Sequence, residues 1–145
     1  MIAAVTDADE WRELVSTAFI PLDVERAPGP FAASLRTSQL GRDTTVSLVA
    51  NTQSTMARTE RGISRGDDDS IFLSLNRSRT FTVAQEGRTA LLHRGWACFT
   101  ASSLPYDLVC PGRIEQVVVK LPRAALPVAR TAQLDALARP YAPGH

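Results

Sequence analysis

The sequence predicts a mainly β protein, a sandwich or barrel of short strands with helical segments at both ends. Short apolar runs, many of them alternating with polar residues, recur between about residue 31 and residue 121, at roughly 8–12-residue spacing. Polar turn clusters separate these runs, among them Gly41-Arg42-Asp43 and the stretch around Asp67-Asp68-Asp69. No run is followed by a long helical pattern, which argues against a parallel sheet with crossover helices.

Residues 1–22 are expected to form an N-terminal helix that packs on the barrel. Asp7 stands at the N-cap position and Glu10 follows three residues later, as in a capping box, while Pro21 ends the helical pattern. Because an isolated helix of this length is marginal in water, its apolar stripe should lie against the strands. The stripe consists of Trp11, Leu14, Val15, Ala18 and Phe19.

Residues 23–122 are expected to form the barrel. Glu86-Gly87, between two apolar arms, predicts a hairpin turn. Gly95 permits a tight entry into one strand, and Pro105 fixes the turn before the next strand. Alternation groups three sets of apolar residues, each on one face of its strand: Val46, Leu48 and Ala50; Ile71, Leu73 and Leu75; and Val117, Val119 and Leu121.

Residues 123–145 are expected to form two short helical segments. Thr131 is the predicted cap of the second segment, which carries Leu134 and Leu137 and stops at Pro140. These leucines are too few to form a core of their own, so they should pack on the barrel or at a two-fold interface.

Composition and charge exclude several classes of function. The chain has 145 residues, 44% of them apolar, with 16 basic and 15 acidic side chains, so its formal charge is +1. This balance leaves no basic footprint for nucleic acid or for an anionic membrane surface. No apolar run approaches the roughly 20 residues of a membrane span, and the N-terminus lacks the pattern of a signal peptide. We therefore expect a cytoplasmic protein whose Cys98 and Cys110 are buried thiols; a disulfide between them would require neighbouring strands.

No metal, cofactor or catalytic residue is predicted. A barrel metal site needs several histidines and a carboxylate, but the chain has only His93 and His145 and no His-x-His motif. The run Asp67-Asp68-Asp69 lacks the spaced oxygen ligands of a calcium loop. Glycine-rich phosphate loops and a nucleophile elbow are also absent from the sequence. The protein is therefore not expected to be an enzyme.

The interior of a small barrel can be filled by side chains or can hold one small ligand. Phe99 can equally be ordinary core, Trp96 and Tyr106 can be half-buried packing residues, and Arg58 can be a surface ion-pair residue rather than an anion hook. The candidate ligand-binding residues are Arg58, Leu73, Leu75, Trp96, Phe99 and Tyr106.

An ordered set of segments resembles the N-terminal sensing domain of AraC/XylS-type transcription regulators, in the subgroup with an AraC-binding-like cupin domain. The set covers about residues 8–130. Two turns depart from the family pattern: Arg94-Gly95-Trp96 replaces a common Pro-Gly-Asp, and residues 76–79 lack a usual glycine. The segments are EWRELVSTAFIPLDV, Phe31 to Gly41, ARTERGI, QEGR, Gly95 to PYDL, and VVVKLPRAAL.

The resemblance implies a cupin-like jelly-roll barrel that binds a small-molecule effector and is followed by dimerisation helices. The family's paired helix-turn-helix units have no counterpart in these 145 residues, so this chain alone should not bind DNA. We expect an effector-binding and dimerisation domain of a transcription regulator that can form a homodimer. One alternative is a free-standing non-metal cupin barrel that acts as an interaction module. A non-metal cupin isomerase or lyase would need two titratable groups inside the barrel. A cavity of a few hundred Å³ would favour the sensor.

Overall fold

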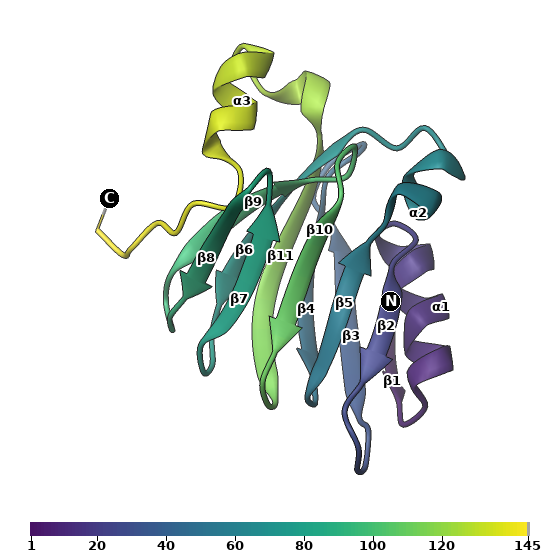
Figure 1. Ribbon diagram of the computed structural model, residues 1–145. Helices are drawn as coiled ribbons and strands as arrows, with labels where there is room; N and C mark the ends of the chain where they lie inside the picture. Colours follow the sequence, from purple (N-terminus) through teal and green to yellow (C-terminus); the bar gives the residue numbers. More distant parts are fainter. Residues whose placement is uncertain (145) are drawn as a thin grey trace.

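Two antiparallel sheets face each other in the computed structural model, which describes residues 1–144 (Figure 1). The six-stranded sheet has the order β1 (Ile2–Val5), β3 (Ala33–Gln39), β4 (Thr45–Asn51), β11 (Ile114–Pro122), β6 (Ser70–Asn76) and β9 (Ala97–Ala101). The five-stranded sheet has the order β2 (Asp23–Arg26), β5 (Ser54–Arg58), β10 (Tyr106–Cys110), β7 (Phe81–Gln85) and β8 (Arg88–Leu92). The helices are α1 (Ala8–Ala18), α2 (Glu60–Ser64), the 3₁₀ helix η1 (Arg123–Ala125) and α3 (Arg130–Ala136). The predicted fold class is confirmed.

The helix α1 lies beside β1 and β2, the edge strands at the same end of the two sheets (Figure 1). Asp7 caps it as predicted, because its side chain accepts a hydrogen bond from the Asp9 N–H at 2.7 Å. The helix is shorter than the expected range of residues 1–22, since Ile2–Val5 form the edge strand β1. Trp11 and Val15 of this helix are fully buried and join the main core between the sheets. The apolar stripe of α1 therefore closes one side of the barrel.

Strand alternation in the six-stranded sheet puts each predicted apolar set on one face of its strand, but that face is not the inner one. The inward side chains are Val49 on β4, Phe72 on β6 and Val118 on β11, all of which belong to the core between the sheets. The predicted apolar sets, which include Leu48 and Leu75, therefore face outward, and each of these two leucines is 39% exposed. Alternation separates the two faces of a strand but does not say which face is buried, and here both faces carry apolar residues.

The hairpin of β7 and β8 turns at Glu86 and Gly87, as predicted. Both residues have positive φ, 55° and 71°, which is the signature of a type I′ turn. This turn matches the right-handed twist of the strands that it joins.

The C-terminal segment runs beside the edge strand β9 and packs its apolar side chains on the outer face of the six-stranded sheet. Leu137 is buried there, and Leu126 and Leu134 pack beside it against Ile71. The predicted Thr131 cap is wrong: α3 begins at Arg130, its N-cap position is Ala129, and Thr131 lies in the first turn. Thr131 follows the actual cap by two residues, so its hydroxyl is inside the helix instead of before it.

Cys98 and Cys110 are both buried and free, on strands of different sheets. Among the described residues, no helix is both long and apolar enough to cross a membrane. His145, one of the two histidines weighed for a metal site, lies outside the described residues.

Candidate functional site

A small cavity lies in the barrel between the two sheets. Its volume is about 40 Å³, and its walls are mainly apolar. The α1 segment supplies Trp11 and Val15, with Phe19 at its C-terminal end, so this helix forms one wall of the cavity. The other walls come from both sheets and from the residue after Pro21: Leu22, Val49, Met56, Phe72, Ser74, Thr100, Tyr106, Leu108, Gln116 and Val118.

Two residues of the cavity lining each carry a buried polar atom that lacks a hydrogen-bond partner among residues 1–144. One is the indole Nε1 of Trp11, a donor, and the other is the amide Oε1 of Gln116, an acceptor. The two side chains are 0% and 3% exposed. An unpaired buried polar group costs roughly 1–3 kcal/mol. A molecule that both donates and accepts hydrogen bonds, such as one bearing a hydroxyl, can therefore gain from entering this cavity.

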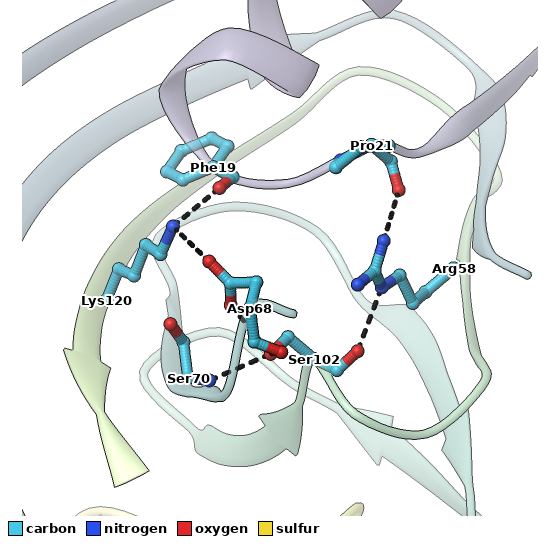
Figure 2. Close-up of polar contacts among 7 residues, drawn as sticks. All are labelled: Phe19, Pro21, Arg58, Asp68, Ser70, Ser102 and Lys120. Carbon is cyan, nitrogen blue, oxygen red and sulfur yellow. Dashed lines mark hydrogen bonds and ion pairs between the residues drawn. The ribbon is translucent and has the colours of Figure 1, made fainter. Parts of the chain in front are cut away.

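The chain that leaves α1 is held to the barrel by two cationic side chains (Figure 2). Lys120 Nζ donates to the Phe19 carbonyl at 2.6 Å, and Arg58 Nη1 donates to the Pro21 carbonyl at 3.1 Å. The Arg58 side chain is only 2% exposed, and its Nε donates to the Ser102 carbonyl at 2.9 Å. We call these contacts the α1 latch, meaning the bonds of Lys120 and Arg58 to residues 19–21.

Asp68 anchors the lysine of the latch (Figure 2). Its Oδ2 lies 3.1 Å from Lys120 Nζ, and its Oδ1 accepts from the Ser102 hydroxyl at 2.8 Å. Burial raises the pKa of Asp68, but hydrogen bonds from Ser102, Ser70 and Lys120 outweigh it, so the net pKa is lowered. The carboxylate is therefore ionised at neutral pH and holds Lys120 in place.

Tyr106 pairs directly with Arg58 in the register of β10 and β5. Burial raises the pKa of its phenol above the ordinary value, although the nearby Arg58 acts in the opposite direction. The neutral phenol lines the cavity together with Ser74 and Thr100. These hydroxyls can donate or accept hydrogen bonds in the same cavity.

The structure separates the six residues predicted to bind a ligand. Tyr106 lines the barrel cavity, and Arg58 lies beside it in the α1 latch. The expectation that Leu73 and Leu75 line the interior is wrong, because the inward positions of β6 belong to Phe72 and Ser74.

The other two predicted ligand residues also lie away from the cavity. Phe99 packs on the outer face of the six-stranded sheet, with its ring 5.9 Å from that of Tyr141. Trp96 is half-buried, and its ring stands edge-on to His93 at 5.1 Å. Sequence reasoning missed Trp11 and Gln116 as site residues. For Gln116 a signal exists, since a polar residue interrupts an alternating apolar set in the strand RIEQVVVKL.

His93 makes no metal-binding group with its neighbours in the part of the chain that the structure describes. Its side chain is exposed, and its Nδ1 lies 3.0 Å from the Thr80 hydroxyl. Within residues 1–144, no group of three or more His, Cys, Asp or Glu side chains is placed to hold a metal ion. The described site therefore offers hydrogen bonds and apolar contact.

Comparison with known proteins agrees with this architecture. A family described as the AraC-binding-like domain matches residues 11–143. The chain belongs to this family. The AraC-binding-like domain is also 28% identical over 133 residues to an uncharacterized protein in nit 5'region from Bacillus sp. (strain OxB-1). That match covers 90% of this chain and 51% of the relative, so the chain spans about half the length of the curated relative.

Solved structures show the same fold. The AraC-like transcriptional activator CuxR is similar with a TM-score of 0.68 and 18% identity, over 86% of this chain and 48% of that chain. An RmlC-like cupin from Shewanella frigidimarina NCIMB 400 is similar with a TM-score of 0.50 and 12% identity, over 71% of this chain and 86% of that chain. The AraC-binding-like domain therefore has a cupin-like β architecture.

Proposed function

We propose that this AraC-binding-like domain senses a small-molecule effector for an AraC/XylS-type transcription regulator, has no enzymatic activity and works in the cytoplasm. The observation that carries the proposal is that two residues of the cavity lining have buried polar atoms without partners among residues 1–144, Trp11 Nε1 and Gln116 Oε1. Family membership supports a regulatory role, and the match to half of a longer relative agrees with a domain that works alongside other parts. The DNA-reading role belongs to such other parts.

The cavity must enlarge to admit an effector. Its 40 Å³ has room for water, whereas ligand pockets for small molecules measure roughly 300–1,000 Å³. Because α1 supplies one wall and its exit is held by Lys120 and Arg58, displacement of α1 is the simplest way to open the barrel. An effector that binds the opened form better than the closed form shifts the population toward it, which changes the surface that α1 presents. Dimerisation, which the family resemblance implies, stays a prediction that sedimentation over a concentration series would test.

A second candidate is a packed interaction module. The small volume of the barrel cavity favours it, because an interior filled by side chains needs no ligand. In that case the unpaired groups of Trp11 and Gln116 are satisfied by an ordered water.

A ligand screen followed by NMR distinguishes the two candidates. Small hydroxylated aromatic acids, amines and sugars are tested for a rise in melting temperature, since a ligand of the folded state stabilises it by mass action. We expect at least one compound to raise the midpoint and to move the indole N–H signal of Trp11. Gln116→Leu should weaken the binding of that compound, whereas Gln53→Leu, at an exposed position outside the cavity, should leave its binding unchanged. If no compound raises the melting temperature and none moves the indole N–H signal of Trp11, the interaction module is favoured.

A further inference from the structure

A second cavity lies outside the barrel, between the six-stranded sheet and the C-terminal segment. Its volume is about 200 Å³, five times that of the barrel cavity. Ile71 of β6 and Phe99 of β9 form its floor, and Leu126, Ala132 and Ala136 of the η1–α3 segment form much of its cover. Its lining is almost wholly apolar, so an uncharged molecule would enter at little electrostatic cost.

One polar group on the lining, the amide of Gln133, is incompletely satisfied. The side chain is 8% exposed, and its Nε2 donates to the Val128 carbonyl at 2.8 Å. Because a backbone carbonyl can only accept a hydrogen bond, the NH₂ end of the Gln133 amide must face Val128, which fixes the orientation of the side-chain amide. The Oε1 atom is then left buried without a partner within the described part of the chain. A residue of the cavity lining therefore carries one unused acceptor, in apolar surroundings.

The walls of this cavity are held open by polar contacts outside it. Arg88 of β8 donates from Nε to the Leu137 carbonyl at 2.8 Å and from Nη2 to the Leu134 carbonyl at 2.7 Å. The Ala138 N–H donates to the Phe99 carbonyl at 2.8 Å. These bonds fix the end of α3 at a set distance from the sheet, so the helix cannot settle into the cavity without breaking them.

We propose that this outer cavity binds a small, flat, uncharged molecule with a single hydrogen-bond donor, in a site separate from the barrel. The donor would pair with Gln133 Oε1, and the ring would contact Phe99 and Ile71. An apolar cavity of about 150 Å³ suffices for benzene, so 200 Å³ has room for a bicyclic ring such as indole. Occupancy would add contacts between α3 and the sheet and would hold the C-terminal segment more firmly.

Indole and indene test this site on the full chain, because they have the same shape and only indole has an N–H donor. In ¹H–¹⁵N NMR titrations, indole should shift the amide signals of Phe99, Gln133 and Leu137. Indene should cause the same shifts with an affinity about 3- to 10-fold weaker, which is the worth of one hydrogen bond. Equal affinity for the two compounds would overturn the role of Gln133.

A variant that fills the cavity tests its location. Ala136→Phe should weaken indole binding at least tenfold, whereas Ala124→Phe, at an exposed position of η1 outside the lining, should leave it unchanged. If Ala136→Phe does not fold, Ala132→Leu serves as the smaller filler. If indole shifts the side-chain N–H signal of Trp11 and none of the three amide signals, indole binds in the barrel. That result would overturn the outer site and leave the proposed effector function standing. No shift of any of these signals at saturating indole would also overturn the outer site.

Discussion

At the scale of single residues, Trp11 links the N-terminal helix to the barrel core. Its ring is fully buried, and its Nε1 has no partner among residues 1–144. Trp11→Ala should lower the free energy of unfolding by about 3–5 kcal/mol, because it removes a large buried ring and leaves a cavity. Trp96→Ala, at a half-buried position, should cost less. Urea denaturation measures both values, and an equal cost for the two variants would contradict the packing role of Trp11.

Glu86 occupies a backbone conformation that suits other residues better. Its φ is 55° in the two-residue turn between β7 and β8. Asparagine tolerates left-handed backbone more readily than glutamate, and Asn-Gly is the favoured type I′ pair. Glu86→Asn should therefore raise the free energy of unfolding by part of the roughly 1–2 kcal/mol that left-handed backbone costs an ordinary residue. Gly87→Ala, at φ 71°, should lower it, and a stabilising effect of that alanine would contradict the turn assignment.

The two thiols should resist modification in the folded protein. Burial raises the pKa of Cys98 to about 12 and that of Cys110 to about 11, from an ordinary value of 9.0. At pH 8 both are protonated, so a thiol reagent should label them only after unfolding. The folded state holds these protons more tightly than the unfolded state, so stability should be full below pH 9 and should fall as the pH rises toward 11–12. Rapid labelling of the native protein at pH 8 would contradict this.

At the scale of elements, the α1 latch determines how readily the N-terminal helix leaves the barrel. Lys120→Met removes the donor to the Phe19 carbonyl and the partner of Asp68. Hydrogen exchange of the α1 amides should become about 10-fold faster, as expected for the loss of a charged hydrogen bond. Arg113→Met breaks an exposed ion pair with Glu115 and should leave that exchange unchanged.

Acid should have a related effect on the latch. Because the pKa of Asp68 is lowered from 3.8, its contribution to stability is present above that pH and is lost as the pH falls through the folded-state value. Exchange of the α1 amides in the native chain should then approach that of Lys120→Met. If the α1 amides exchange at the same rate in the native chain and in Lys120→Met, the helix is held by apolar packing alone.

At the scale of the whole molecule, charge limits what this chain can bind. With 16 basic and 15 acidic residues, it has almost no net positive charge with which to attract phosphates. The purified chain should therefore show no sequence-dependent DNA binding in a gel-shift assay at physiological salt. Tight binding that distinguishes one DNA sequence from a scrambled control would contradict the assignment of DNA reading to other parts of a regulator.

The sequence by itself determined the features that depend on neighbours along the chain. Asp7 caps α1 because its side chain reaches an N–H two residues away, and Glu86-Gly87 turns the hairpin because of local backbone preference. The mainly β class follows in the same way from short alternating runs. These signals act over a few residues and need no knowledge of the rest of the fold.

Only the tertiary structure decided which face of each strand lines the barrel. Leu73 and Leu75 are on the outer face, while Gln116 points into the core, because the five-stranded sheet and α1 cover the inner side of the six-stranded sheet. α1 fills the inner side with Trp11, and the C-terminal segment brings Leu137 to the outer side. A period of two distinguishes the faces of a strand, but which face is buried depends on contacts between residues far apart in sequence.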